Sequence, residues 1–296
     1  AFYSSHGYQL FQKAIPSLLI DKCLDHFEAM KRRQTLLYYT QSTHRWVKPK
    51  LTIDGLLVDS VLNPSQQIQA PYFASAVRHI IYHESIYNSL RTVCPNYLDF
   101  ICWQDMAFDQ STGTVDHIDS WYLDTEQVGG VIGVWIALED ISTDSGPFYI
   151  YPKSHKYGDI PTDTSQNHQQ FLASVNDRIV TQELTRMPML LRKGDILLWN
   201  SLLIHGASLP TDAKASRKSL TAHFYPLGMR RKGNSHTKIF LQDLRAHRPT
   251  LHPRLFRLSR KYRTPLFYAF AGPLLAIKDR LGLISNNAWN MRRDQY

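Results

Sequence analysis

The sequence predicts a mainly β domain of the sandwich or jelly-roll type, with flanking helices on both sides of it in the chain. Between residues 97 and 226, short segments rich in β-branched and aromatic residues alternate with turn sequences such as Ser111-Thr112-Gly113. Before residue 97 the apolar residues recur at helical spacing, and after Pro226 the strand character disappears. Many short strands separated by turns are typical of sandwiches and jelly rolls, so the β segment forms the centre of the predicted fold.

Each element is predicted from its own pattern. Helices are predicted over residues 20–30 and 72–93, and the polar stretch 43–67 is expected to be loop with short strands. The predicted strands are, in chain order, 99–107, 115–120, 131–138, 148–151, 189–192, 195–199 and 219–225. Residues 157–184 are polar and interrupt this series, so they are expected to form an insertion that is part helix and part loop.

The charge distribution divides the chain into two regions. Hydrophobic residues make up 43% of the 296 residues, which is enough to bury a sizeable core. The net charge is +9, yet residues 1–226 carry −3, whereas residues 227–263 contain 11 Lys or Arg and one acid. We therefore expect a jelly-roll domain with N-terminal helices over residues 1–228 and a basic helical extension over residues 229–296.

Three interpretations of the basic extension stay open. It could be a helical appendage packed on the domain with a solvated basic face, a contact with an anionic membrane surface, or a contact with nucleic acid or another anionic partner. Residues 251–277 mix Arg and Lys with Leu, Phe and Tyr, a texture that suits an amphipathic helix lying on a bilayer. The apolar stretch 265–277 is shorter than the roughly 20 residues of a membrane span. No nucleic-acid-binding motif occurs, so no nucleic-acid partner is expected.

The cysteines and the first residues of the chain favour an intracellular setting. The three cysteines are an odd number, and no pair has the spacing of a zinc or redox site. Residues 1–7 lack a basic segment followed by an apolar run. The expected localisation is cytoplasmic, with peripheral membrane association through the extension as the alternative.

The segment Asp116-His117-Ile118-Asp119 carries the clearest chemical signal. It lies in a predicted strand, where residues two apart point to the same side, so His117 and Asp119 can both reach one ion. His205 follows at the end of a later strand-like run. Two imidazoles and one carboxylate form the facial triad of non-haem iron oxygenases, which leaves positions open for other ligands.

A His-x-Asp or His-x-Glu pair is a weak signal by itself in a chain with 13 histidines. His26-Phe27-Glu28 is a second match, but it falls in a helical pattern, where positions two apart face roughly opposite ways. We therefore expect His26 to lie on a solvated helix face. The pair His117 and Asp119 is favoured because it has strand context and a later partner.

Arg217 lies 12 residues after His205, just before the last predicted strand. Its planar guanidinium can bind a carboxylate through two hydrogen bonds. An isolated Arg in this position is usually a surface residue. Its place after His205, on a neighbouring strand, favours a role as the anchor for the distal carboxylate of a 2-oxo acid.

The stretch from Gln104 to Tyr225 resembles the phytanoyl-CoA dioxygenase family. Four blocks carry the likeness: His117-Ile118-Asp119; residues 133–142 (GVWIALEDIS); residues 145–155 (SGPFYIYPKSH); and Gly194-Asp195 leading to His205-Gly206, Arg217-Lys218 and His223-Phe224. Residues 7–10 and the following helix also look like the family's N-terminal opening. The likeness covers about three-quarters of the chain.

This resemblance implies a double-stranded β-helix, a cupin-like jelly roll, with Fe(II) as cofactor and 2-oxoglutarate and O2 as cosubstrates. It maps the metal ligands onto His117, Asp119 and His205. Residues implied to contact 2-oxoglutarate are Arg217, Trp135, Gln104 and Ser208. Two positions depart from the family pattern. The order His205-Gly206-Ala207-Ser208 moves the serine one place from its usual position, and Asp109 stands where relatives often have a basic residue.

Candidate substrate contacts come from position alone. Trp121 and Tyr122 directly follow the ligand pair, so they either stack on a substrate at the pocket mouth or pack the barrel. Arg178 and Arg186 lie in or beside the insertion and either meet an anionic substrate or remain solvated. His155 and His223 belong to the family blocks, but we expect structural roles for both, with His223 close to the site.

These features together predict a dioxygenase that hydroxylates, or otherwise oxidises, a C–H bond of a small-molecule or lipid-like metabolite and releases succinate and CO2. A carboxylate at Asp119 argues against halogenation, because related halogenases keep a small residue there to make room for chloride. Two alternatives belong to other classes: a jelly-roll binding protein without catalysis, and a membrane-surface protein that acts through the basic extension. The substrate and the oligomeric state are not encoded in a recognisable motif.

Overall fold

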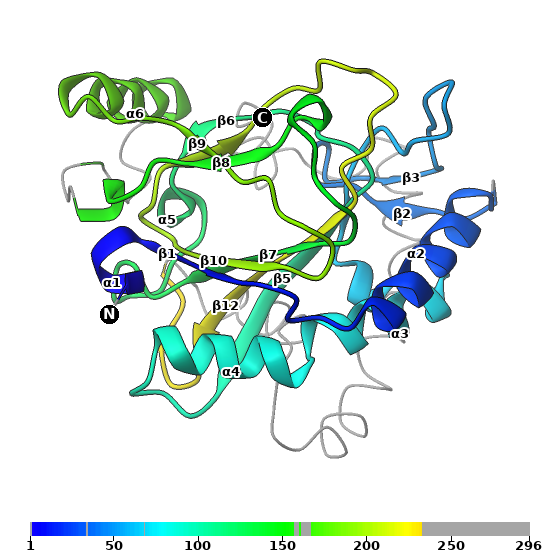
Figure 1. The fold of residues 1–296 in the computed structure, drawn as a ribbon, viewed down its shortest axis with the longest axis horizontal. Coiled ribbons are helices and arrows are strands. Elements are labelled where there is room, and N and C mark those ends of the chain that lie inside the picture. The colour runs from blue at the N-terminus through cyan, green and yellow to red at the C-terminus, as the bar shows by residue number, and fades with distance from the viewer. Residues whose placement is uncertain (1, 34, 68, 157–159, 161–166, 233–296) are drawn as a thin grey trace, which may run out of the picture.

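Two facing antiparallel sheets form the centre of the fold in the computed structural model, which describes residues 2–33, 35–67, 69–156, 160 and 167–232 (Figure 1). The basic extension predicted for residues 229–296 therefore lies outside the described residues from position 233 onward. Among the described helices, none has the length and apolar character needed to cross a bilayer.

The larger sheet has six strands in the order β1-β10-β7-β12-β5-β4. Their bounds are β1 (Tyr8–Phe11), β10 (Ile196–Asn200), β7 (Ile132–Ala137), β12 (Ser219–Pro226), β5 (Phe100–Phe108) and β4 (Val61–Leu62). All of its strand pairs are antiparallel. Its longest strands, β5 and β12, pair with each other along their length.

The smaller sheet has the order β6-β11-β8-β9. Its strands are β6 (Thr114–His117), β11 (His205–Ala207), β8 (Phe148–Ile150) and β9 (Met187–Pro188), and a separate ribbon is formed by β2 (Tyr38–Tyr39) and β3 (Trp46–Val47). From β5 to β8 the chain alternates between the two sheets, and it does so again from β10 to β12. This winding is that of a double-stranded β-helix, so the predicted jelly roll is confirmed.

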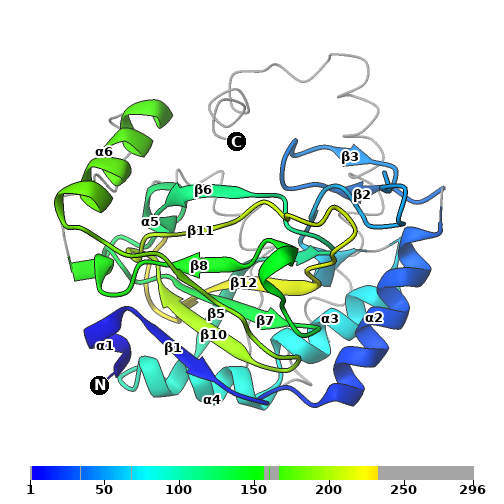
Figure 2. The ribbon, with the colours of Figure 1, turned by 45° about the horizontal axis from the view of Figure 1, so that its top comes forward.

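Helices α2 (Ser17–Lys31), α3 (Pro71–Ile81) and α4 (Glu84–Val93) cover the outer face of the six-stranded sheet (Figures 1 and 2). The other helices are α1 (Phe2–His6), α5 (Asp119–Tyr122) and α6 (His168–Thr181), and there are 3-10 turns at η1 (Pro64–Gln66), η2 (Thr143–Ser145) and η3 (Ser154–Lys156). The single helix predicted over residues 72–93 is two helices. The break comes at His83, whose side chain accepts a hydrogen bond from the Ser85 N–H and caps α4.

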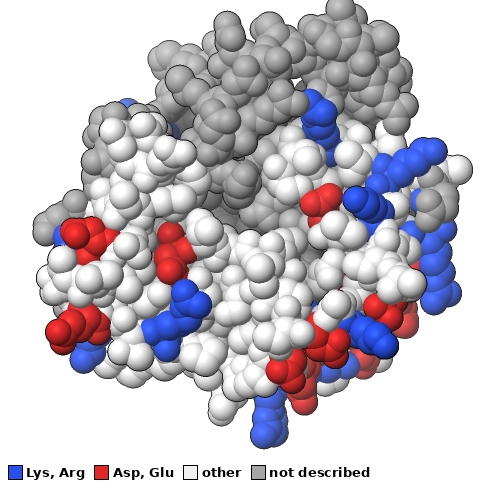
Figure 3. Space-filling view, turned by 90° about the horizontal axis from the view of Figure 1, so that it is seen from above, with Lys and Arg blue, Asp and Glu red and all other residues white. Residues whose placement is uncertain are grey.

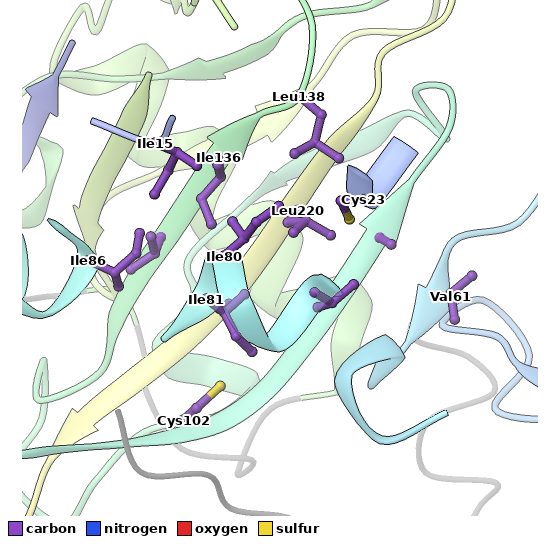
Figure 4. Close-up of a cluster of buried hydrophobic side chains, with 14 of the residues drawn as sticks. Ile15, Cys23, Val61, Ile80, Ile81, Ile86, Cys102, Ile136, Leu138 and Leu220 are labelled. Atoms are coloured by element: carbon purple, nitrogen blue, oxygen red, sulfur yellow. The ribbon is translucent and has the colours of Figure 1, made fainter. Parts of the chain in front are cut away.

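The main core lies between the six-stranded sheet and helices α2, α3 and α4. Leu220 of β12 and Ile136 of β7 meet Ile80 of α3 there, and Cys23 and Cys102 are buried in the same cluster as free thiols (Figure 4). Because side chains alternate along a strand, Thr221 and His223 of β12 point to the opposite face, toward the second sheet. That inner face carries the polar groups described below.

A second core fills the space between the sheets, and a third lies under α6. The inner core contains Trp135, Phe148, Leu197 and Trp199. The third cluster joins Trp121 and Tyr149 to Phe171 and Val175 of α6, which lies beside β6 and α5 (Figure 2). The predicted insertion is therefore a helix, in its described part, that packs against one end of the smaller sheet.

Three predicted details of the strands were wrong. β1 falls in a region predicted to be mainly helical, and its four residues pair only along one edge of β10. β11 was not predicted as a strand, because its three residues include Gly206. The strand expected over residues 189–192 is instead β9, two residues earlier, and Met189 and Leu191 make single backbone bonds to Phe148 and Ile141 outside any strand.

Candidate metal centre

His117, Asp119 and His205 converge on one point between the sheets. His117 ends β6, His205 begins β11, and the two residues are direct partners across these adjacent strands. The Nε2 atoms of His117 and His205 lie 3.6 and 3.5 Å from the same carboxylate oxygen, Oδ1 of Asp119. One ligand atom from each of the three residues lies within 4.8 Å of the others, which is the spacing of a metal site.

The other ring nitrogen of each histidine sets its orientation. Nδ1 of His117 lies 2.8 Å from the Val115 carbonyl oxygen, and Nδ1 of His205 lies 2.8 Å from the Leu203 carbonyl oxygen. A carbonyl can only accept, so each Nδ1 carries the hydrogen and each Nε2 presents a lone pair. Both imidazoles are therefore in the tautomer that a metal ligand needs.

The protonation states also suit a metal. Burial opposes ionisation of Asp119, but His205 and His223 outweigh it and hold the pKa of the carboxyl well below its usual range. Burial, followed by the neighbouring His117, lowers the pKa of His205, which favours its neutral form. A carboxylate and neutral imidazoles are the forms that bind transition metals.

The strand expected over residues 115–120 ends at His117, and Asp119 is the first residue of the short helix α5. Ile118 remains extended, with φ −116° and ψ 139°, so His117 and Asp119 still face the same side. The chain then turns because Ser120 donates its N–H to the Ser201 carbonyl and its hydroxyl to Asp124. The prediction of a shared side was confirmed, although its continuous strand was wrong.

Arg217 is a buried cation two residues before β12. It is 3% exposed, and the central carbon of its guanidinium lies 5.3 Å from the Phe108 ring centroid and 5.7 Å from that of Trp135. Its Nε is buried without a partner, and no ion pair to its guanidinium occurs in the described part of the chain. Burial lowers the pKa of Arg217 to about 10. Such a group fits an anionic ligand that supplies the missing partner.

The neighbouring cations are already neutralised by Asp109. Its carboxylate accepts from Lys31 Nζ at 2.6 Å and also from Lys218 Nζ, and Glu28 lies within 3.4 Å of both lysines. This explains the carboxylate at a position where the family resemblance leads one to expect a basic residue. Sequence reasoning did not identify this ion cluster, because Lys31 and Asp109 are 78 residues apart.

Trp135 has the surroundings expected of a residue near the cosubstrate, whereas Gln104 and Ser208 have other partners. Trp135 is 1% exposed on the inner core and faces Arg217, as a pocket-lining residue should. Gln104 instead places its amide nitrogen 3.4 Å from Nδ1 of His223. Ala207 rather than Ser208 shares the side of β11 from which His205 projects, and the backbone of Ser208 bonds to Pro147 and Ser111. The expected contact of Ser208 with 2-oxoglutarate stays a prediction, and the alternation of side chains along β11 argues against it.

The residues expected to contact a substrate have different surroundings, and the adjacent Trp121 and Tyr122 of α5 face different neighbours. Trp121 is 5% exposed and stacks on Phe171 of α6, with ring centroids 4.6 Å apart. Tyr122 meets the metal-ligand side instead, since its ring lies edge-on to His117 at 5.6 Å and its hydroxyl is 2.9 Å from Nε2 of His168. Arg178 is half-buried in the last turn of α6. Arg186 contacts Asp116 and the Tyr149 ring.

His26, His155 and His223 lie outside the ligand cluster, as expected. His26 stacks on Tyr72 from the surface of α2, and Glu28 pairs with lysines, so the second His-x-Glu match is not part of a metal cluster among the described residues. Nε2 of His155 lies 3.1 Å from the Ser4 carbonyl oxygen, which ties η3 to the N-terminal helix. His223 lies beside Asp119 without belonging to the ligand set.

The sequence profile of the phytanoyl-CoA dioxygenase family matches residues 3–219. The chain belongs to the phytanoyl-CoA dioxygenase family. This confirms the resemblance drawn from the four sequence blocks, and the match runs through all three ligand positions and Arg217. The His-Asp-His cluster is therefore a candidate metal site within a domain of this family.

Individual relatives match over a shorter stretch. A Caenorhabditis elegans protein, phytanoyl-CoA dioxygenase domain-containing protein 1 homolog, is 27% identical over 119 residues, which is 36% of this chain and 39% of the relative. The Mus musculus phytanoyl-CoA dioxygenase domain-containing protein 1 is 31% identical over 113 residues, or 36% and 37% of the two chains. The chain thus aligns with less than half the length of these relatives.

Solved structures show the same fold. The non-heme alpha ketoglutarate dependent carbocyclase SnoK aligns over 81% of this chain and 88% of its own, with a TM-score of 0.57 and 15% identity. The epimerase SnoN, in complex with Fe3+, alpha ketoglutarate and nogalamycin RO, aligns over 76% and 81% of the chains, with a TM-score of 0.55 and 17% identity. At this identity the likeness concerns the jelly roll and not the substrate.

Proposed function

We propose that this protein is an Fe(II)- and 2-oxoglutarate-dependent dioxygenase that oxidises a C–H bond of a small-molecule or lipid-like substrate, with release of succinate and CO2. The observation that carries the proposal is that a cluster of metal-ligand atoms and a buried cation lie together between the sheets. Three ligand atoms surround a single point, and Arg217, a buried cation without an anionic partner among the described residues, lies on the same inner face.

The donor set fits iron. Two imidazoles and one carboxylate on adjacent strands form a facial group that leaves positions open. His117, Asp119 and His205 would hold the metal, and Arg217 would hold the distal carboxylate of 2-oxoglutarate through its planar guanidinium. When bound, iron with 2-oxoglutarate and O2 supplies the oxidising power, while the protein supplies placement and exclusion of water.

The residues around the site favour a dry interior at the anchor end. Trp135 and Phe148 are buried and stack with their ring centroids 5.4 Å apart, and Phe108 lies under Arg217. In such surroundings an ion pair between Arg217 and a carboxylate is stronger than in water. The substrate would enter from the side of Tyr122 and His168, because Tyr122 is the aromatic residue of α5 that contacts His117.

We favour hydroxylation as the outcome, and the carboxylate of Asp119 at the ligand position argues against halogenation. The solved neighbours SnoN and SnoK are described as an epimerase and a carbocyclase. Epimerisation and ring closure are therefore the outcomes that product analysis must separate from hydroxylation. Each would use the same ligands and the same anchor.

Charge on the described residues does not point to a polyanionic partner. Residues 1–232 contain equal numbers of basic and acidic residues, so the whole excess of +9 lies in residues 233–296. On the face seen in Figure 3, charged side chains of both signs are scattered among uncharged ones. A small-molecule substrate is thus the simplest partner for the jelly roll itself.

The test is anaerobic titration of the full chain with Fe(II) and 2-oxoglutarate, followed by measurement of succinate after air is admitted. We expect a visible charge-transfer absorption when both are present, and succinate release that Asp119→Ala abolishes. His26→Ala is the matched control, because it removes the other His-x-acid histidine and should leave turnover unchanged. Near-normal succinate release by Asp119→Ala would overturn the proposal, and absence of the absorption in the unmodified chain would favour a non-catalytic binding protein.

A further inference from the structure

The two carboxylate oxygens of Asp119 have different partners. Oδ1 faces the Nε2 atoms of His117 and His205, at 3.6 and 3.5 Å. Oδ2 faces away from them and lies 2.9 Å from Nε1 of Trp199 and 3.3 Å from Nε2 of His223. The carboxylate is therefore divided into an inner oxygen, which belongs to the ligand cluster, and an outer oxygen, which belongs to the protein.

The Trp199 indole is fixed in place by its neighbours. It is 1% exposed on β10, between Phe148 and His205, with ring centroids 5.1 and 5.2 Å away. Gly133 is its direct partner on β7, and a Cβ at that position would lie 2.0 Å from the indole Cε2. The glycine leaves the space that the ring needs to reach Asp119. An indole N–H can only donate, so its bond to Oδ2 also satisfies a buried donor.

His223 of β12 reaches the same outer oxygen from the other side of β7. Gln104 is its direct partner on β5, and the Gln104 amide nitrogen lies 3.4 Å from Nδ1 of His223. An amide nitrogen donates, so Nδ1 accepts, and the ring hydrogen is then on Nε2, which faces Oδ2 of Asp119. Gln104 thus donates to His223, and His223 in turn donates to the Asp119 carboxylate.

We propose that Trp199 and the Gln104–His223 pair are positioning residues that hold the outer oxygen of Asp119, so that the carboxylate presents a single oxygen to the metal. The inference rests on the proposed function. A carboxylate that chelated through both oxygens would occupy one position more, and three single-atom ligands are what leave room for a bidentate 2-oxo acid and O2. Partners of this kind commonly change metal affinity 10–100-fold when removed.

Trp199→Phe removes the N–H donor and keeps an aromatic ring in the core. We expect Co(II), used as a spectroscopic probe, to bind about tenfold or more weakly. We also expect the Co(II) absorption spectrum to change as the carboxylate turns. Trp46→Phe on β3 is the matched control, because it makes the same substitution away from the ligand cluster. Thermal unfolding without metal identifies any general loss of stability.

Two further variants separate positioning from packing. Gly133→Ala keeps the indole but displaces it, and should weaken Co(II) binding in the same way as Trp199→Phe. His223→Leu should weaken binding, whereas His223→Gln, which retains an N–H donor, should recover much of it. Co(II) affinity and spectrum that are unchanged in folded Trp199→Phe and His223→Leu would overturn the inference. Failure of the unmodified chain to bind Co(II) would instead count against the proposed function.

Discussion

The guanidinium of Arg217 lies 5.7 Å from the centroid of the Trp135 ring, in an interior where no described carboxylate offsets its charge. A buried cation without a partner lowers the stability of the folded chain, and this is visible as the lowered pKa of Arg217, about 10. The arrangement costs stability in the free protein and becomes favourable when an anion binds.

Arg217→Met is therefore expected to affect the free and the liganded protein in opposite ways. The free protein should unfold at a higher temperature, because an apolar side chain of similar length replaces a desolvated charge. The dissociation constant for 2-oxoglutarate should rise by about 30-fold or more, since loss of one member of a buried charge pair costs about 2 kcal/mol or more. Thermal unfolding with and without 2-oxoglutarate, in the presence of Co(II), measures both effects.

The exposed Lys214, three residues earlier, provides the control for Arg217. Lys214→Met removes the same charge from the same loop and should change neither the unfolding temperature nor the affinity for 2-oxoglutarate. If Arg217→Met left the affinity for 2-oxoglutarate unchanged, Arg217 would not be the anchor.

Asp109→Asn is expected to destabilise the fold by about 3–5 kcal/mol, because it leaves buried lysine charge without its main partner. Lys31 is 2% exposed and its Nζ lies 2.6 Å from the Asp109 carboxylate. Chemical denaturation measures the loss. The double variant Asp109→Asn with Lys31→Met should recover part of it, because the uncompensated charge is then gone. Equal stability of the single and double variants would show that the ion pair is not the cause.

Asp105 gives the stability a pH dependence of defined sign. It is fully buried beneath η1, where Ser65 donates to it, and burial raises its pKa to about 6. In the unfolded chain the group ionises near 3.8, so between these values the folded state holds the extra proton. The stabilisation is complete below about pH 4 and is lost as the pH rises through 6.

Asp105→Asn should remove this dependence while keeping a neutral group of the same shape. The difference in unfolding free energy between the unmodified chain and the variant should change by about 2–3 kcal/mol between pH 4 and pH 7, in the variant's favour at the higher pH. Denaturant titrations across that range measure it. Asp177→Asn on the exposed side of α6 is the reference, and an identical slope in both variants would contradict the assignment to Asp105.

That His117 and Asp119 face the same side could be predicted from the sequence, because it depends on local geometry. His117 and Asp119 share a side of an extended segment whether or not a strand continues past Ile118, so the error in the strand boundary did not matter. His205 and Arg217 lie 12 residues apart in the same family block, and this block predicts that they belong to one site. The rejection of His26 also needed only helical periodicity.

The supports of the site could not be predicted in this way. Trp199 and Asp119 are 80 residues apart, and their hydrogen bond depends on the register that places Gly133 beneath the indole. The ion cluster around Asp109 joins α2, β5 and the start of β12, so no spacing in the sequence reveals it. Such contacts arise from how the sheets and helices are packed, which a hydrophobic pattern does not encode.

Trp121 and Tyr122 of α5 contact different parts of the structure. The two residues are adjacent, but Trp121 stacks on Phe171 of α6 at 4.6 Å, whereas Tyr122 lies edge-on to His117 at 5.6 Å. Trp121→Ala should cost about 3–5 kcal/mol of stability and increase hydrogen exchange of the α6 amides, because the stacked ring anchors that helix. Tyr122→Phe keeps the packing and should leave α6 nearly as protected, apart from its first turn at His168. Hydrogen–deuterium exchange resolved by segment distinguishes the two. If Trp121→Ala left α6 protected, the Trp121 ring would not anchor that helix. The result would then favour the other interpretation of the sequence, in which Trp121 stacks on a substrate.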